Sequence, residues 1–414
     1  MSTVFPMREL RSVPNKPNKT WQRPTVAEFF AGIGLVRMGL EQAGFQVVWS
    51  NDIEPSKRDM YVHHFGETPG HEFVCRSITE VEATDIPSGL SLYWASFPCT
   101  DLSLAGGRKG LAGKSSSTFW EFTRILGELS AGSRPEVVAL ENVTGFATSH
   151  GGADITAAIR KLNELGYSVD VMAIDARRFV PQSRPRLFLV GALNPPVEED
   201  EKISDLRPAW LSHVFDNPEL RTHRARLDEP LPPLLERGLA DVVERIPFDD
   251  SRWWDAERTQ KFLDSLSPLQ DQRLRSLQKE RRLSYRTAYR RTRNGVPTWE
   301  VRSDEVAGCL RTARGGSSKQ AVVEAGGGDI RIRWMTGLEY ARLMGAGDYH
   351  IDGLRASQVL FGFGDAVCVP VVAWLAKNYL IRLLQGDFAE KTPVSNEQTL
   401  KQDCLWSVRE MEAV

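Results

Sequence analysis

Cys99 is the side chain in this sequence best suited to covalent chemistry. It lies in the run Phe97-Pro98-Cys99-Thr100, directly after the short apolar segment 92–96, which is typical of a β-strand. A thiol in that place is expected at the carboxyl edge of a sheet, where α/β proteins place their sites. A cysteine taken alone is more often a small core residue. The glycine-rich basic stretch 101–110 suits a loop that closes over a polyanion, and this favours a nucleophile.

Three charged residues are predicted to lie at the same edge of the sheet. Glu141 follows the apolar segment 137–140, so its carboxyl group can act as an acid or a hydrogen-bond partner, although a helix cap is the simpler alternative. Arg184 and Arg186 are two residues apart, and an extended strand points both toward one side, where a small ligand can bind. A solvated turn would also explain this pair.

A glycine-containing turn, Phe30-Ala31-Gly32-Ile33-Gly34, follows the first predicted strand and opens a helix. Glycines there let a ligand approach the backbone closely, although an ordinary strand-to-helix turn has the same pattern. Asp52 follows the second predicted strand about twenty residues later, where an acid can bind a ribose hydroxyl pair. The turn lacks a third glycine, which favours a nucleoside cofactor without pyrophosphate, such as S-adenosylmethionine.

These residues must be positioned by alternating strands and helices, a pattern typical of an α/β fold with a parallel sheet. The predicted strands are 26–30, 46–50, 92–96, 137–140, 168–174 and 187–190, and the predicted helices include 35–43 and 118–129. We expect them to form one catalytic, cofactor-binding domain over residues 25–197. A composition shift at Asn194-Pro195-Pro196 and the acidic run 198–201 mark its end.

Composition and charge narrow the class of protein. The 414 residues suffice for two or three domains, and a net charge of -2 gives no whole-chain sign of polyanion binding. Two segments are nevertheless basic: a predicted flexible arm, 1–24, and 271–320. The five scattered cysteines argue against a disulfide framework and against a zinc site, so no metal is expected. Without a membrane span or an N-terminal signal peptide, a cytoplasmic protein is expected.

Six motifs occur in an order and spacing that resemble the DNA (cytosine-5-)-methyltransferase family of bacteria and phages. They are Phe30-Ala31-Gly32-Ile33-Gly34, Pro98-Cys99, Glu141-Asn142-Val143, Gln182-x-Arg184-x-Arg186, Glu339-x-x-Arg342 and Gly364-Asp365-Ala366-Val367-x-Val369-Pro370. They span residues 25–385, which is nearly the whole chain. The resemblance implies a Rossmann-like, S-adenosylmethionine-dependent methyltransferase domain with a smaller, irregular target-recognition domain.

The same resemblance implies a reaction and a role for each catalytic candidate. Cys99 would add to carbon 6 of a cytosine flipped out of duplex DNA, after which carbon 5 accepts the methyl group and S-adenosylhomocysteine is the product. Glu141 would bind the ring nitrogen and the exocyclic amine of the base. Arg184 and Arg186 would stabilise the charge that develops on it.

The implied cofactor site draws residues from several parts of the chain. They are Phe30, Gly32, Gly34, Asp52, Ile53, Ser77, Ile78, Pro98, Asp365 and Val367. Three positions depart from the family pattern: Ser77 stands where Asp is usual, Thr100 where Gln is usual and Asp365 where Asn is usual. A carboxylate at position 365 would repel the cofactor's own carboxylate or be protonated, so one alternative is a modified cofactor that transfers another group.

DNA contacts are expected mainly from the target-recognition domain, 198–330. Basic and aromatic residues mix over 279–293, and 311–318 resembles a glycine-rich recognition loop, although a charged run is usually only a solvated face. The candidate DNA-binding residues are Ser103, Lys109, Arg286, Arg290, Arg311, Arg314 and Ser317. Residues 331–388 are expected to form a hinge and a C-terminal return, in which Glu339 and Arg342 are structural supports, and 389–414 a tail.

The expected partner is double-stranded DNA, bound by a monomer, and the resemblance allows a cognate restriction endonuclease in the same system. An RNA cytosine methyltransferase is an alternative, since the chemistry at Cys99 would be the same; the basic segment favours duplex DNA. A catalytically silent DNA-binding homologue is a second alternative. The presence of Cys99, Glu141, Arg184 and Arg186 disfavours it.

Overall fold

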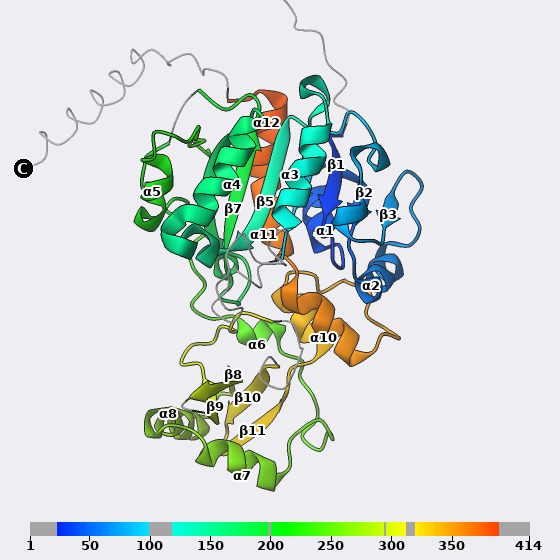
Figure 1. Ribbon diagram of the computed structural model, residues 1–414. Coiled ribbons are helices and arrows are strands. Elements are labelled where there is room, and N and C mark those ends of the chain that lie inside the picture. The colour runs from blue at the N-terminus through cyan, green and yellow to red at the C-terminus, as the bar shows by residue number, and fades with distance from the viewer. Residues whose placement is uncertain (1–22, 99–117, 198–199, 294, 312–318, 389–414) are drawn as a thin grey trace, which may run out of the picture.

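The computed structural model describes residues 23–98, 118–197, 200–293, 295–311 and 319–388. Two domains are visible in Figure 1: a large one around a seven-stranded sheet, and a smaller one below it around a four-stranded sheet. Helix α6 (Leu239–Val242) and helix α10 (Ala356–Asp365) lie between them.

The large sheet has the order β3-β2-β1-β4-β5-β7-β6. Its strands are β1 (Thr25–Phe29), β2 (Gln46–Asn51), β3 (Glu72–Val74), β4 (Leu92–Ala95), β5 (Val137–Val143), β6 (Ser168–Asp175) and β7 (Pro185–Ala192). The six predicted strands are all confirmed. The expectation of a parallel sheet holds for β1 to β5, whereas β7 runs antiparallel to both β5 and β6. The short connection between β6 and β7 explains this, because a parallel pair needs a long crossover.

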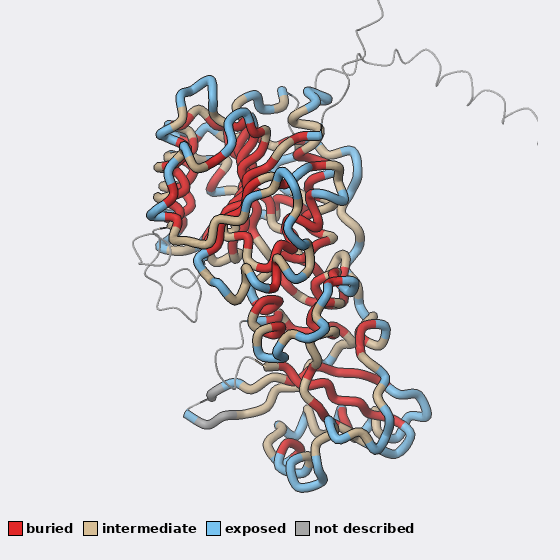
Figure 2. Tube along the Cα trace, turned by 90° about the vertical axis from the view of Figure 1, so that its right-hand side faces the viewer, coloured by how far each residue is buried: buried red, intermediate tan, exposed pale blue. Residues whose placement is uncertain are grey.

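Helices cover both faces of the large sheet. Helix α1 (Leu35–Gln42) packs with α11 (Val369–Leu375) over one face, and α3 (Thr118–Glu128) and α4 (Ala153–Glu164) cover the other. The predicted helices 35–43 and 118–129 are therefore confirmed. Figure 2 shows the buried residues concentrated in the strands and in the inner sides of these helices.

The remaining helices of the large domain are short, apart from α2. They are α2 (Pro55–Phe65), α5 (Ser212–Phe215), α9 (Gly337–Leu343) and α12 (Ile381–Gln385), with a π-helical turn at Ala376–Leu380. The 3-10 turns are Ile78–Glu80, Ala83–Asp85, Ala131–Ser133, Thr144–Ala147, Ser149–Gly152, Ala176–Arg178 and Ala209–Leu211.

The C-terminal helices form one long apolar stretch. Within Ala356–Gln385 the most apolar 18-residue window has a mean hydropathy of 2.0, so the stretch could cross a membrane by length and composition alone. However, 67% of the most apolar window is buried in the fold, where α11 packs against α1. This burial accounts for the apolar character of the stretch within the core.

The segment that follows β7 divides between the two domains. Its first part lies along β6, where the backbone N–H of Ala173 donates to the carbonyl of Leu206 at 2.8 Å. Asp170 of β6 and Arg207 form a fully buried ion pair, with Nη2 and Oδ2 2.6 Å apart. Residues 200–225 of the expected recognition interval therefore extend the large domain.

The small domain is more regular than the irregular module we expected. Strands β8 (Ser284–Arg293), β9 (Val296–Val301), β10 (Ala321–Gly326) and β11 (Asp329–Trp334) form an antiparallel sheet in the order β11-β10-β8-β9. Helices α7 (Ala256–Asp264) and α8 (Pro268–Gln278) accompany it. Their core contains Phe262, Leu274, Val323 and Ile332.

A buried ion pair joins the two domains. Arg333 of β11 donates through Nη1 to Oε2 of Glu339 on α9 at 2.8 Å, and both side chains are fully buried. Glu339 also accepts the backbone N–H groups of Glu244 and Thr336, while Arg342 donates to the carbonyl of Val242. The prediction that Glu339 and Arg342 are structural supports is confirmed.

Candidate active site

Glu141 and Arg186 meet where β5 and β7 pair. The antiparallel register places Arg186 opposite Val143, two residues beyond Glu141, so the two side chains share one face of the sheet. Arg186 Nε lies 2.9 Å from Glu141 Oε1, and the side chains are only 16% and 9% exposed. The predicted convergence of these two residues is thus seen in the structure.

Burial makes Glu141 a weaker acid than usual. Desolvation raises the pKa of its carboxyl group, although Arg186, Arg184 and the Ser96 hydroxyl oppose the shift. The net direction is upward, so the proton is held to a higher pH than on an ordinary glutamate. A carboxyl group of this kind can protonate a ring nitrogen or hold an amine by hydrogen bonds.

The Arg184 guanidinium binds main-chain carbonyls from two distant segments, and its backbone N–H binds a nearby carboxylate. Its Nη1 donates to the carbonyl of Leu310 at 2.9 Å, its Nη2 to the carbonyl of Ala366 at 2.7 Å, and its backbone N–H to Oδ1 of Asp175 at 2.7 Å. The side chain is almost fully buried. This geometry suits a residue that positions the pocket, because its guanidinium is already engaged by the protein.

Cys309 lies beside both arginines and was missed as a site residue by the sequence analysis. Its Sγ is 3.2 Å from Arg184 Nη1 and 3.9 Å from Arg186 Nη2. Burial alone would raise the pKa of this thiol, but the two guanidinium groups outweigh it and lower the pKa. Nothing in the local sequence signals this contact, which joins residues more than 120 positions apart.

The predicted nucleophile, Cys99, lies outside the described residues, as do Thr100, Ser103 and Lys109. The chain is described up to Pro98. Just before it, the buried ring of Phe97 packs against Phe119 and Phe146, and Asn142 Nδ2 donates to the carbonyl of Phe97 at 3.2 Å. The strand end that precedes Cys99 is therefore held next to the residue that follows Glu141.

The glycine turn is built around Asp52. Gly32 N–H donates to Asp52 Oδ2 at 2.8 Å, and Phe30, Gly32 and Gly34 all have positive φ angles. Gly34 has a second reason to be glycine, since a Cβ there would lie 2.4 Å from the Phe65 ring. Burial raises the pKa of Asp52, with Lys57 and backbone N–H groups opposing. The turn and the acid, both cofactor candidates from the sequence, are therefore in hydrogen-bond contact.

The other cofactor candidates differ in how open they are. The Ile53 side chain is 66% exposed at the end of β2, which leaves an apolar surface for a flat ring, whereas Ile78 and Val367 are buried. Ser77 caps the turn Ile78–Glu80, with its Oγ accepting from Thr79 N–H at 3.3 Å. A glycine turn with positive φ angles, one buried acid and an exposed apolar side chain fit an adenosyl cofactor.

Asp365 has a partner that the sequence analysis did not predict. Its Oδ2 lies 2.9 Å from Nζ of Lys57, which comes from α2. The two residues are 308 positions apart, so no local pattern signals the pair.

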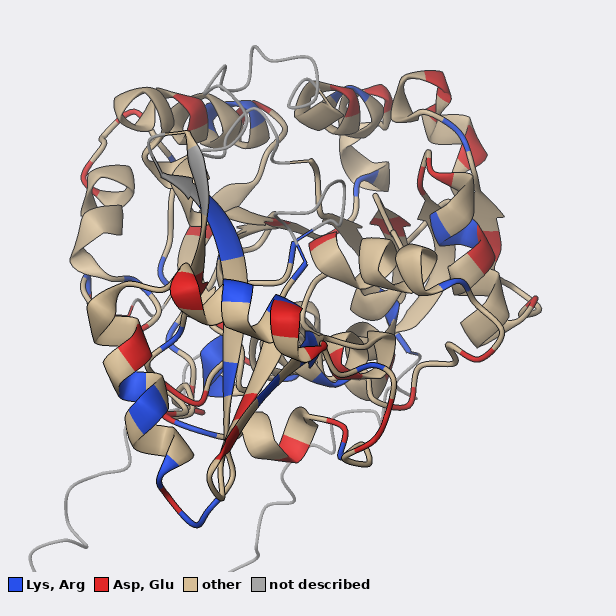
Figure 3. Cartoon of the chain, turned by 90° about the horizontal axis from the view of Figure 1, so that it is seen from below, with Lys and Arg blue, Asp and Glu red and all other residues tan. Residues whose placement is uncertain are grey.

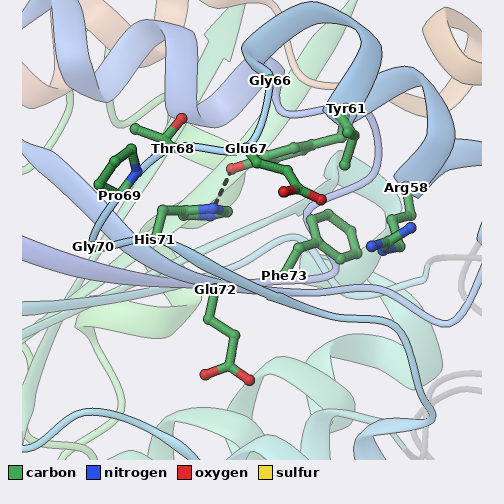
Figure 4. Close-up of a pocket in the computed structure, with 11 residues that line it drawn as sticks. Arg58, Tyr61, Gly66, Glu67, Thr68, Pro69, Gly70, His71, Glu72 and Phe73 are labelled. Carbon is green, nitrogen blue, oxygen red and sulfur yellow. Dashed lines mark hydrogen bonds between the residues drawn. The ribbon is translucent and has the colours of Figure 1, made fainter.

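A separate pocket is lined by residues of α2 and of the segment that follows it. It has a volume of about 540 Å3 and lies between α2 and the segment that leads into β3 (Figure 4). Tyr61 Oη lies 3.0 Å from His71 Nε2, and Ser50 Oγ contacts both. Burial, together with Arg37, lowers the pKa of His71 to about 4, so the ring is neutral at physiological pH. None of our predicted site residues lines this pocket.

The predicted DNA-binding residues are not equally available. Arg286 is only 9% exposed and lies 3.3 Å from Glu305, and the Arg290 guanidinium lies 5.7 Å from the centre of the Trp299 ring. Arg311 is exposed and directly follows Leu310, the partner of Arg184. Arg314 and Ser317 lie outside the described residues.

The basic segment does not form a uniform positive face. Figure 3, seen from the small domain, shows Lys and Arg mixed with Asp and Glu. Arg291 pairs with Glu300, and Arg302 pairs with Asp304. The excess of basic residues in the sequence is therefore partly neutralised within the small sheet.

The sheet order and the glycine turn define a Rossmann-like domain of the methyltransferase kind. The chain belongs to the C-5 cytosine-specific DNA methylase family, whose model matches residues 25–380. The Dnmt2 methyltransferase of S. pombe shares the fold, with a TM-score of 0.55 and 18% identity over 89% of this chain and all of that one. The Entamoeba histolytica methyltransferase EhMeth gives a TM-score of 0.56 at 15% identity, also over 89% of this chain and all of that one.

The curated relatives align with this chain over different shares of their own length. Type II methyltransferase M.NlaX of Neisseria lactamica is 36% identical over 177 residues, which are 42% of this chain and 53% of that protein. Type II methyltransferase M.Bsp6I of Bacillus sp. (strain RFL6) is 26% identical over 358 residues, which are 85% of this chain and 97% of that protein. The alignments thus span about half of the first relatives and nearly all of M.Bsp6I.

Proposed function

We propose that this protein is a DNA cytosine-5 methyltransferase that uses S-adenosylmethionine. The observation that carries the proposal is the buried Glu141–Arg186 pair. This pair lies at the sheet edge where Asn142, the next residue after Glu141, binds Phe97, two residues before Cys99. Family membership supports the same chemistry.

In the proposed reaction, the Cys99 thiolate forms a bond to carbon 6 of a flipped cytosine, and the ring electrons move toward the ring nitrogen and the carbonyl oxygen. Glu141 supplies a proton to that nitrogen and accepts a hydrogen bond from the exocyclic amine. Arg186, which Glu141 aligns, lies where it can stabilise the carbonyl oxygen, and Arg184 holds the pocket.

Carbon 5 then carries the electron density needed to accept a methyl group, which S-adenosylmethionine supplies when bound. Loss of the carbon-5 proton and breakage of the S–C6 bond restore the aromatic ring and free Cys99. The residues proposed to hold the cofactor are the Phe30–Gly34 turn, Asp52 at the ribose, Ile53 at the adenine, and Ser77 and Pro98 at the rim.

The proposal also covers the substrate, the oligomeric state and the cellular location of the protein. We infer that duplex DNA is the substrate and that the small domain contacts it, with Arg311 as the best-exposed basic candidate. A monomeric state, a cytoplasmic location and a cognate restriction endonuclease remain predictions.

Mass spectrometry of nucleosides tests the proposal directly. Duplex DNA and tRNA are incubated separately with the protein and S-adenosylmethionine, and we expect 5-methylcytosine in the DNA only. Cys99→Ala should abolish the product, and Cys75→Ala, which keeps Cys99, should retain it. Product in tRNA alone would favour the RNA alternative. A carbon-5 group other than methyl on cytosines of DNA from cells that express the protein would favour a modified cofactor.

A further inference from the structure

The Lys57–Asp365 ion pair closes the rim of the glycine turn. Lys57 lies on α2 and Asp365 is the last residue of α10, with 2.9 Å between Nζ and Oδ2. The lysine side chain is 14% exposed and the aspartate side chain 43% exposed. The lysine charge is thus held below the surface, and the carboxylate is the more open of the two groups.

Both residues are fixed against the turn by packing. The Lys57 Cδ atom would be 4.0 Å from a Cβ built on Gly32, so its stem lies beside the turn. On the other side, a Cβ on Gly362 of α10 would meet the Ile33 side chain at 2.8 Å, so α10 lies directly on the turn. The ammonium also lies 5.5 Å from the centre of the Phe361 ring.

The charges around the pair favour a zwitterionic ligand. Burial alone would lower the pKa of Lys57, but Asp365 and Asp52 outweigh it and raise the pKa. One ammonium is thus shared by carboxylates on both sides of the turn. An aspartate alone would repel the carboxylate of an amino-acid ligand. The adjacent lysine charge offsets this repulsion, because it attracts the same carboxylate.

We propose that Lys57 and Asp365 together recognise the amino-acid end of the cofactor, with Lys57 taking the α-carboxylate and Asp365 the α-ammonium. The inference rests on the proposed function and narrows it: the ligand is a cofactor with an intact zwitterionic amino-acid group. The opposite charges of the pair are complementary to those of the ligand, as recognition of a zwitterion requires.

Calorimetry with S-adenosylhomocysteine tests this assignment without any turnover. The second ligand is its decarboxylated analogue, which keeps the adenosine and the ammonium. We expect Lys57→Met to weaken S-adenosylhomocysteine binding roughly tenfold or more and to change binding of the analogue little. Asp365→Ala, which removes the acceptor, should weaken both ligands, because both carry the ammonium. Lys57→Arg, which keeps the charge, should retain most of the affinity.

Arg58→Met is the matched control, since Arg58 is the next residue of α2 and faces the pocket of Figure 4. It should bind both ligands as the wild type does. Equal losses for both ligands in Lys57→Met, or no loss, would overturn the role of Lys57. Wild-type protein that binds neither ligand would instead contradict the proposed cofactor itself, which separates the two failures.

Discussion

At the scale of single residues, the proposed chemistry depends on a carboxyl group that is both buried and paired. Desolvation at the end of β5 raises the pKa of Glu141, and Arg186 keeps the shift moderate while fixing the carboxylate orientation. Protonated and ionised forms are therefore closer in energy than on a surface glutamate, which suits a group that transfers a proton.

Glu141→Gln should lower kcat by about 100-fold or more, because the amide cannot supply a proton to the ring nitrogen. Since the described ion-pair partner of Glu141 is Arg186, which is not proposed to hold the cofactor, binding of S-adenosylhomocysteine should be unchanged. Because the active form of Glu141 is the protonated one, the wild-type rate should fall as the pH rises through the raised pKa of this carboxyl group. The variant has no such group, so its rate should not show this fall. Initial rates across a pH series that begins near the ordinary glutamate pKa of about 4.3 provide the measurement; a variant with the wild-type rate would refute this role.

Cys309 should be the most readily alkylated of the three described cysteines. Arg184 and Arg186 lower the pKa of Cys309, whereas burial raises that of Cys75 and that of Cys368, the latter to about 12. Peptide mass spectrometry after iodoacetamide treatment at pH 6–10 should find the half-maximal rate for Cys309 at the lowest pH.

The control for Cys309 removes one of its cationic neighbours. Arg186→Gln should move the half-maximal alkylation of Cys309 to higher pH and leave Cys75 where it was. Equal titration of the two thiols in the wild type would show that the arginines do not stabilise a thiolate.

At the scale of elements, the strands that carry apolar runs could be predicted, whereas the short strand β3 and the direction of β7 could not. Strand β3 has only three residues, and its order depends on pairing with β2 rather than on its own pattern. The direction of β7 likewise depends on the length of the connection after β6. In the small domain, the charged residues of β8 hid a regular sheet whose core is mainly aliphatic, with partly buried aromatic residues packed against it.

A buried carboxyl in β1 makes the stability of the large domain depend on pH. Burial raises the pKa of Glu28 from 4.5 to about 8, despite the nearby Arg37. The folded state favours the protonated form, so this contribution to stability is fully present below pH 4.5 and is lost as the pH rises through 8.

Glu28→Gln should therefore melt like the wild type near pH 5 and roughly 2–5 °C higher at pH 9, because the amide stays neutral. Differential scanning calorimetry at both pH values is the measurement, and Glu80→Gln, at an exposed position, is the control. An equal difference from the wild type at both pH values would mean that Glu28 does not titrate in this range.

At the scale of the whole molecule, contacts between distant segments complete the site. The catalytic candidates Glu141, Arg184 and Arg186 could be predicted because each follows or begins a strand with a recognisable motif. Cys309 and Lys57 could not, because their partners are brought to them only by the docking of the small domain and of α10. The sequence therefore predicts the site residues at the strand ends, but not the residues that distant segments bring into contact with the site.

The Arg333–Glu339 pair should be the strongest single link between the domains. Arg333→Met leaves the Glu339 charge buried without its cation and should cost about 3–5 kcal/mol in urea unfolding. Arg252→Met removes the cation of an exposed pair and should cost less than about 1 kcal/mol. Similar losses for the two variants would argue against a special role for the buried pair.

Covalent trapping on duplex DNA that contains 5-fluorocytosine tests the central claim most directly. Fluorine at carbon 5 cannot leave as a proton does, so a cysteine that has added to carbon 6 stays attached after methyl transfer. With S-adenosylmethionine present, we expect a complex that survives denaturation, carries one methyl group and maps to Cys99, and none with Cys99→Ala. Trapping that persists in Cys99→Ala, or its absence from the wild type, would contradict the account.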